Sequence, residues 1–442
     1  MSTVTIRNTS SLPAWDLTTI YPGPASSEYA ASVTALVARL DGLEQLIARA
    51  EALPARDGRD VTSLFETLRE EADAAFLIAH RNTSFLYGYI FVDSRDQVAQ
   101  AKMSELSLVR ARFLRFSIRF TAWLGTLDLD ALIASSETAR SHAFLLRQAA
   151  IEARHQMEPA QEDLQAELTL SGGSAWSRLD DDITSQIMVP FENDDGVVEQ
   201  HPMPEIRNFA MSADREVRRR AYEAELDAWK LWQTPIAAAL NGVKGEHATL
   251  ARRRGWDSIL EQSHHQNHID RQTLDAMMGA ARDAFADFRR YFHAKAKVIG
   301  VEKLAFYDLF APLSSEGREW PWEETLDVVY DQFGRYSPKM RGLAERAIAE
   351  QWVDAGSRPG KVGGAFCMSV GGEESRVLMN FTPAFDGVRT LAHELGHAYH
   401  NLCQAGVTPW RRGSTPMTLA ETASTFCETI LTQAAIANGH RG

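Results

Sequence analysis

The sequence has 442 residues, 45% of them hydrophobic and 24% charged, which is an ordinary composition for a globular protein with a sizeable core. Acidic residues (59) outnumber basic ones (46), and the formal charge of −13 argues against nucleic acid and anionic membrane as partners. Three cysteines are too few for a disulfide framework and indicate a reducing compartment, and no apolar run approaches the roughly 18 residues of a membrane-spanning helix.

Apolar residues recur at helical spacing along most of the chain, so the sequence predicts a mainly α fold. Residues 32–53 are an example, with Leu36, Leu40, Leu43 and Ile47 on one face. The first residues lack the basic segment and apolar run of a signal peptide, and we expect none. Similar stripes predict further helices over residues 62–88, 95–123, 140–170, 214–250, 272–298 and 322–353.

A first interruption of the helical pattern lies at residues 186–203. Two β-rich runs flank Asn-Asp-Asp-Gly there, and the Asp-Gly pair favours the tight turn of a hairpin. A new series of helices follows. We therefore place a domain boundary near 195–205, between an N-terminal helical domain (residues 1–200) and a second domain (residues 201–442).

A second interruption lies at residues 364–381. Two β-rich runs flank a turn that begins with Gly371-Gly372, which predicts another hairpin. The hairpin leads into a helix, for which Thr382 is the expected N-cap and Pro383 the expected first residue.

That helix carries the segment TLAHELGHAYH (residues 390–400), which contains the pattern His-Glu-x-x-His. His393 and His397 are four residues apart, so both imidazoles lie on one face, within reach of one zinc ion. Glu394 is offset from His393 by about 100°, and we expect it to act on water as a general base. Gly396 costs about 1 kcal/mol relative to alanine within a helix. We expect glycine here because another helix packs closely against it.

A catalytic zinc needs a third protein ligand. The class that uses a third histidine does not fit, because His400 and Cys403 occupy the glycine and third-histidine positions of its motif. After a loop rich in glycine and proline, Ser414-Thr415-Pro416 predicts the start of another helix. Glu421 lies about one turn into that helix, among small residues, and we expect it to be the third ligand.

Four further polar side chains need an interpretation. Glu428, two turns beyond Glu421, is either a carboxylate that orients a metal-binding imidazole or an ordinary surface residue. His400 is a fourth ligand, a polar group that lines a cleft, or a buried core histidine. His264 and His268 also have helical spacing, but no third ligand accompanies them, so we assign no metal there.

The segments HELGHAYH (residues 393–400) and LAETASTFCE (residues 419–428) resemble the oligoendopeptidase F branch of the thimet-oligopeptidase-like M3 metallopeptidases. WDLTTIY (residues 15–21) is similar to the opening segment of that branch, and GGAFC (residues 363–367) to the strand before its catalytic helix. The resemblance implies a mainly α, helical channel-type gluzincin metallopeptidase fold, with a small β-hairpin or sheet next to the active-site helix.

The resemblance also implies a function, namely zinc-dependent cleavage of internal bonds in short unstructured peptides in the cytoplasm. One Zn²⁺ per chain would be bound by His393, His397 and Glu421, with Glu394 as the catalytic base. The strand that contains Gly364, Ala365 and Phe366 would pair with the extended substrate.

Members of this family continue beyond the glutamate helix, with a histidine and tyrosines that stabilise the oxyanion. We therefore expect a truncated form with impaired activity, because losing one oxyanion donor lowers the rate about 100- to 1,000-fold. Two alternatives stay open: a metallocarboxypeptidase of related fold, and a non-catalytic fragment that binds peptide or zinc. The sequence leaves the oligomeric state open.

Overall fold

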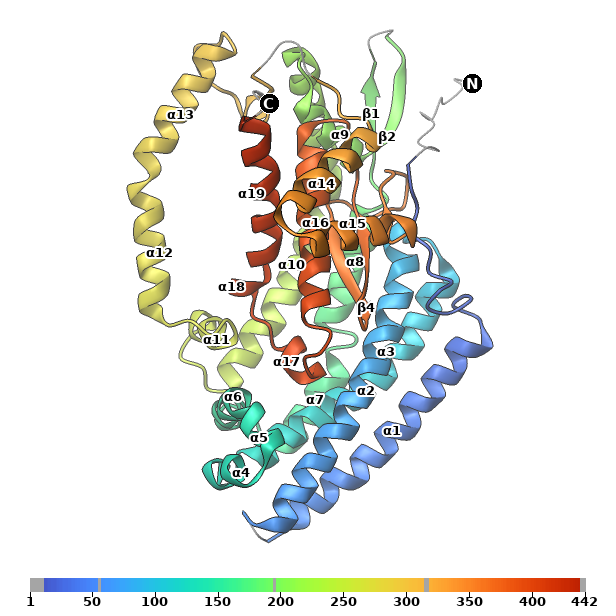
Figure 1. Ribbon diagram of the computed structural model, residues 1–442, viewed down its shortest axis with the longest axis vertical. Coiled ribbons are helices and arrows are strands. Elements are labelled where there is room, and N and C mark those ends of the chain that lie inside the picture. The colour runs from blue at the N-terminus through green and yellow to red at the C-terminus, as the bar shows by residue number, and fades with distance from the viewer. Residues whose placement is uncertain (1–11, 55–56, 194–195, 314–317, 438–442) are drawn as a thin grey trace.

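Helices dominate the structure, a computed structural model that describes residues 12–54, 57–193, 196–313 and 318–437 (Figure 1). None of the helices in these ranges is both long and apolar enough to cross a membrane. The helices are α1 (Ser27–Ala52), α2 (Arg59–Val92), α3 (Gln97–Leu124), α4 (Leu129–Ser135), α5 (Glu137–Ser141), α6 (Ala143–Arg154), α7 (Pro159–Leu168), α8 (Gly173–Thr184), α9 (Met203–Asn208), α10 (Arg215–Arg253), α11 (Ile259–Gln266), α12 (Arg271–Asp283), α13 (Phe285–Val298), α14 (Trp322–Tyr336), α15 (Pro338–Ala349), α16 (Phe385–Cys403), α17 (Pro409–Gly413), α18 (Met417–Ala420) and α19 (Thr422–Ala437).

The predicted stripes fall on these helices, and the mainly α prediction is confirmed. Two of the stripes prove to be pairs of helices, because a proline occupies the first turn of the second helix. Pro159 begins α7 and Pro338 begins α15, and a proline cannot donate the backbone hydrogen bond that would continue the preceding helix. The stripe at residues 272–298 also divides, at Ala284.

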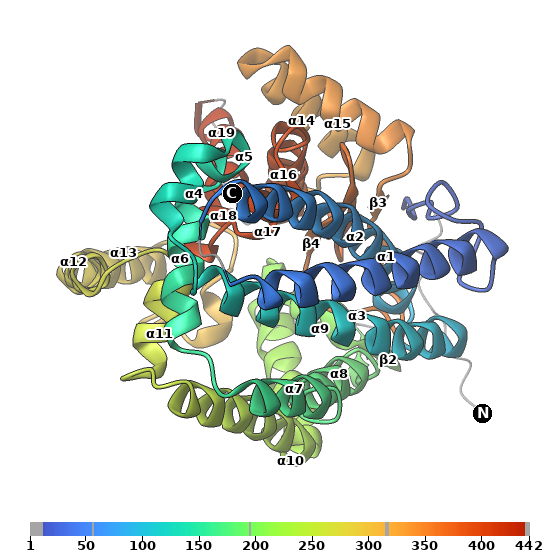
Figure 2. The ribbon, with the colours of Figure 1, turned by 90° about the horizontal axis from the view of Figure 1, so that it is seen from below.

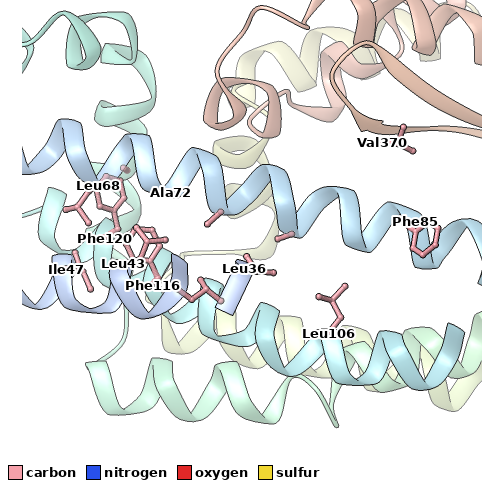
Figure 3. Packing of buried hydrophobic residues seen from close by; sticks show 14 of the residues in the cluster. Leu36, Leu43, Ile47, Leu68, Ala72, Phe85, Leu106, Phe116, Phe120 and Val370 are labelled. Atoms are coloured by element: carbon pink, nitrogen blue, oxygen red, sulfur yellow. The ribbon is translucent and has the colours of Figure 1, made fainter. Parts of the chain in front are cut away.

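The N-terminal helices α1, α2 and α3 lie side by side and enclose the larger hydrophobic core (Figures 2 and 3). Side-chain caps fix where α1 and α3 begin, since Ser26 accepts the Tyr29 N–H and Asp96 accepts the N–H groups of Val98 and Ala99. This core also takes in Val370 and Leu378 from the second half of the chain. The core residues labelled in Figure 3 are Leu36, Leu43, Ile47, Leu68, Ala72, Phe85, Leu106, Phe116, Phe120 and Val370.

Both predicted hairpins are confirmed. β1 (Met188–Glu192) and β2 (Val198–Pro202) pair antiparallel, although part of their connecting turn lies outside the described residues. β4 (Phe366–Gly371) and β5 (Glu374–Leu378) form the second hairpin, and β3 (Val353–Asp354) joins it alongside β5. The sheet order is β3-β5-β4, with β3 parallel and β4 antiparallel to β5. The division into domains of residues 1–200 and 201–442 stays a prediction.

The three-stranded sheet connects the N-terminal helices to α16. On one side, the Ser84 hydroxyl of α2 donates to the Ser369 carbonyl at 2.9 Å, and Phe91 packs edge-on against Phe366. On the other side, Val377 of β5 and Leu395 of α16 belong to a second hydrophobic core. The sheet therefore sets the position of α16 relative to the N-terminal helices.

A buried ammonium group fixes the loop that precedes β4. The Lys361 Nζ donates to Asp354 Oδ1 at 2.6 Å and to the carbonyls of Asp354, Gly356 and Met379. Lys361 is fully buried, and burial lowers its pKa to about 8. Four oxygen partners satisfy an ammonium that water cannot reach.

The predicted start of the histidine helix is wrong by two residues. Ala384 is the N-cap of α16 and makes no side-chain bond, and Pro383 lies outside the helix. The segment folds back over the first turn instead: the Thr382 carbonyl lies only 2.2 Å from where a Cβ on Gly387 would be. The Pro383 carbonyl accepts the Trp320 N–H at 2.9 Å, which fixes this path.

Candidate metal centre

The site is built on two helices, α16 and α19, that pack directly against each other. Gly396 lies at their contact. A Cβ on Gly396 would lie 2.8 Å from both the Ala423 carbonyl oxygen and the Ser424 Cα, which are backbone atoms. Carbon atoms in contact are normally about 3.5–4.0 Å apart, so only glycine permits this approach. The packing expected from the weak helix former is therefore observed.

The close approach brings His393, His397 and Glu421 together. Glu421 Oε2 lies 3.2 Å from His393 Nε2 and 3.3 Å from His397 Nε2. One ligand atom from each of the three residues lies within 4.8 Å of the other two. Among the described residues, no other group of His, Cys, Asp and Glu side chains comes together in this way. Two imidazole nitrogens and a carboxylate oxygen that converge in this way form a donor set for a divalent transition metal. These three side chains therefore fit a metal ion.

Electrostatics favour the protonation states that bind metals. Burial lowers the pKa of His397, which favours the neutral ring. The Ser424 hydroxyl donates to Glu421 Oε2 at 2.7 Å, and this hydrogen bond lowers the pKa of Glu421, which favours the carboxylate. Ser424 was not singled out in the sequence, although its spacing of three residues from Glu421 could have indicated it.

The predicted setting of Glu421 inside a helix is wrong in one respect. The four-residue α18 ends at Ala420 and α19 begins at Thr422, so Glu421 lies at the junction between the two helices. Pro416, rather than Ser414 or Thr415, precedes α18, and no side chain caps it. The Ser424 hydroxyl bonds both the carboxylate and the carbonyl of Glu421 and holds this junction. Local hydrogen bonds of this kind compete with regular helical bonding.

Glu394 is buried beside the three candidate ligands. Its side chain is 4% exposed, and its Oε2 has no hydrogen-bond partner among the described residues. Burial, reinforced by the charge of Glu421, raises the pKa of Glu394 to about 8. A buried carboxyl oxygen without a partner is expensive, and such groups in native proteins usually have a functional reason.

Glu428 lies behind His393, on the side away from Glu421. Its Oε2 is 3.3 Å from His393 Nδ1, and its other oxygen pairs with Arg389. A carboxylate at this place can hold the ring with Nε2 turned toward the metal. Arg389 was also not singled out, although it precedes His393 by four residues and therefore lies on the same helical face.

His400 lies outside the group of candidate ligands. Its Nε2 is 2.9 Å from the Gln404 amide nitrogen, and the ring borders a cavity of about 1130 Å³ between α16, α19 and the α5–α6 region. Of the three interpretations of His400, this arrangement favours a polar group that lines a cleft. His264 and His268 belong to no metal-binding group in the described part of the chain.

Gly364, Ala365 and Phe366 lead into β4, which is an edge strand. The Val377 N–H donates to the carbonyl of Trp352, the residue before β3, so the backbone of Val377 faces away from β4. Backbone groups alternate along an antiparallel ladder, so those of Phe366 and Met368 point toward β5. The backbone of Cys367 therefore faces the outer edge of the sheet. Gly364 has a φ of 79°, and its carbonyl accepts the Asn380 amide at 2.9 Å.

The chain is similar to known peptidases. The model of peptidase family M3 matches residues 208–440, and that of oligopeptidase F matches residues 124–188. An oligoendopeptidase F homologue of Lactococcus lactis is 24% identical over 432 residues, which are 95% of this chain and 69% of that protein. Oligopeptidase PepF of Bacillus subtilis is 25% identical over 305 residues, which are 69% of this chain and 46% of that protein.

Solved structures share the fold. Oligoendopeptidase-F from Enterococcus faecium has a TM-score of 0.60 at 18% identity, over 92% of this chain and 68% of that one. PZ peptidase A, solved with an inhibitor, has a TM-score of 0.66 at 14% identity, over 90% and 73% of the two chains. The helical metallopeptidase architecture expected from the sequence is thereby confirmed.

Proposed function

The chain belongs to peptidase family M3 and is a metalloendopeptidase of the oligoendopeptidase F branch, and we propose that it uses zinc to cleave internal bonds of short, unstructured peptides. The observation that carries this proposal is the convergence of His393, His397 and Glu421 beside the buried Glu394. Two imidazoles and one carboxylate are a typical protein donor set for catalytic zinc, which keeps a further position open.

The side chains divide the work between binding and proton transfer. His393, His397 and Glu421 would hold the ion, and Glu428 would orient the His393 ring. When bound, zinc supplies a positive charge that polarises the scissile carbonyl and acidifies water. Glu394 would take a proton from the attacking water and pass it to the leaving amine. Its unpartnered, buried Oε2 supports this role.

The edge of β4 supports an extended peptide as the substrate. The Cys367 backbone faces this edge, and β4 packs against α16, the helix that carries Glu394. An extended peptide that paired with this edge would pass beside Glu394. The three cysteines are unpaired, which supports a reducing compartment such as the cytoplasm.

The test measures metal and products together. Zinc content and cleavage of a quenched fluorescent peptide, amidated at its C-terminus, are compared for wild type, Glu394→Gln and the helix-surface control Glu345→Gln. We expect the wild type and the control to cut the peptide internally and to lose activity with a chelator. Glu394→Gln should keep zinc but lose turnover.

Two outcomes would contradict the proposal. Cleavage by Glu394→Gln at the wild-type rate would remove Glu394 from its role. Release of C-terminal residues alone, from a peptide with a free C-terminus, would indicate a carboxypeptidase instead.

A further inference from the structure

The segment between α16 and Glu421 is anchored on the N-terminal helices by one tryptophan. The Trp410 ring of α17 contacts two polar side chains: the Arg69 guanidinium is 4.3 Å from the ring centroid, and the His142 ring stacks at 5.3 Å. Phe120 of α3 packs edge-on against the same indole. Figure 2 shows α17 beside α2, the helix that carries Arg69.

Hydrogen bonds and an ion pair also fix Arg69, His142 and the segment; we call Trp410 and these two partners the clamp. Asp73 pairs with Arg69 and accepts the Trp410 backbone N–H at 3.3 Å. His142 Nδ1 is 2.7 Å from the Thr138 carbonyl, which can only accept, so Nδ1 carries the proton. His142 Nε2 then accepts the Thr408 hydroxyl at 2.7 Å. Arg69 is 6% exposed and His142 is 3% exposed, so both are buried partners of a segment that comes from the other half of the chain.

Hydrogen bonds stabilise two turns on the path from Trp410 to Glu421. The Ser414 hydroxyl donates to the Trp410 carbonyl at 2.7 Å. The Pro416 carbonyl then accepts the N–H groups of Leu419 and Ala420, and the Glu421 carbonyl accepts the Thr425 N–H. Only a short segment, made of these two turns, separates Trp410 from Glu421. We therefore expect a displacement of the Trp410 ring to be transmitted to Glu421.

We propose that Trp410, held by Arg69 and His142, is a positioning residue that sets where the Glu421 carboxylate lies relative to His393 and His397. The N-terminal helices supply no candidate metal ligand, and through this clamp they determine the geometry of the metal centre. This inference rests on the proposed function, because it assigns the clamp a role at the same metal site. Ligand atoms must lie within about 0.2 Å of their ideal distances, so a small shift of the segment is enough to weaken binding.

The experiment compares Trp410→Ala with two other variants of the full chain. Trp410→Phe keeps an aromatic ring next to Arg69 and His142. Trp123→Ala removes a more deeply buried indole from the same core, at a position on α3. Hydrogen exchange of the amides in residues 417–425 is measured without metal. Zinc affinity is measured by competition with a chelator, and the visible spectrum of the Co²⁺-substituted protein reports the geometry of coordination.

We expect Trp410→Ala to accelerate exchange in residues 417–425 and to lower zinc affinity by about tenfold or more, as the loss of a group that orients a ligand does. The Co²⁺ spectrum should change, and Trp410→Phe should restore most of the affinity. Trp123→Ala should lower only the overall stability.

Unchanged exchange and an unchanged spectrum in Trp410→Ala would overturn the inference, as would equal effects of Trp410→Ala and Trp123→Ala on zinc affinity. Exchange is measured without metal, so it tests the clamp even if the wild type binds no zinc. In that case the proposed function fails, whereas faster exchange in Trp410→Ala would still show that the tryptophan positions Glu421.

Discussion

Replacing Gly396 by alanine tests the contact on which the metal centre depends. The added Cβ would lie 2.8 Å from the Ala423 carbonyl oxygen and 2.8 Å from the Ser424 Cα. Both are backbone atoms, so no side-chain rotation can relieve the contact. Reaching an ordinary separation of about 3.5 Å requires α16 and α19 to move apart by more than half an ångström.

The expected effect on stability is small, because two terms oppose each other. Overpacking at a tight contact costs about 1–3 kcal/mol. Alanine in place of glycine within a helix contributes about 1 kcal/mol in the opposite direction. The net loss in the free energy of unfolding is therefore about 0–2 kcal/mol. A fold of this size should survive such a change.

The expected effect on the metal is larger, because Glu421 precedes α19 and would move with it. A metal site tolerates errors of about 0.2 Å in its ligand distances, and the shift exceeds that tolerance. We expect zinc affinity to fall about tenfold or more, with a matching loss of peptide turnover at limiting zinc. Chelator competition measures the affinity, and urea unfolding monitored by circular dichroism measures the stability.

The matched control is Gly342→Ala. Gly342 lies in α15, and no atom comes within 4 Å of where its Cβ would be. That variant should be slightly more stable than the wild type and bind zinc equally well. If Gly396→Ala kept the zinc affinity and turnover of the wild type, glycine would not be needed for the approach of the helices, and the reasoning would fail.

Three further predictions follow from other parts of the molecule. Glu428→Gln weakens the carboxylate hydrogen bond at His393 Nδ1 and should lower zinc affinity about 10- to 100-fold by chelator competition; unchanged affinity would make Glu428 an ordinary surface residue. Lys361→Met removes the ammonium from Asp354 and from three buried carbonyls, while Arg358 still pairs with Asp354, so it should lower the free energy of unfolding in urea by about 1–3 kcal/mol; an unchanged free energy of unfolding would show that the ammonium is dispensable. Burial raises the pKa of Cys367 to about 12, so this thiol stays protonated at pH 8.5 and should resist iodoacetamide, whereas the exposed Cys403 should react. Mass spectrometry of the peptides measures the labelling, and equal labelling of both cysteines would contradict the prediction.

Much of the fold could be predicted from local sequence. The helical stripes and both hairpins follow from apolar spacing and turn chemistry, which act over a few residues. The errors lie where a distant contact decides the outcome. Thr382 does not cap α16, because its carbonyl folds over Gly387 and Trp320 bonds to the next residue. Trp320 lies far from the cap in the sequence, so the local pattern cannot reveal this contact.

Much of the candidate site could be predicted from the sequence, because short spacings between residues determine which side chains share a helical face. His393 and His397 lie one helical turn apart, and that spacing alone places them on one face. The break at Glu421 could not be predicted, since a serine hydroxyl that turns back to the preceding residues produces no distinct pattern. The Trp410 clamp was also invisible, because its partners Arg69 and His142 are more than 200 residues earlier in the chain.

The junction at Glu421 has a consequence for how the molecule responds to its metal supply. His397 and Glu421 lie at the two ends of a long loop that contains α17 and α18. A metal ion bound by both residues would therefore act as a reversible cross-link. In the chain-entropy treatment, closing a loop of roughly two dozen residues stabilises the folded state by about 3 kcal/mol. Metal starvation would then lower the free energy of unfolding of the whole molecule by a similar amount.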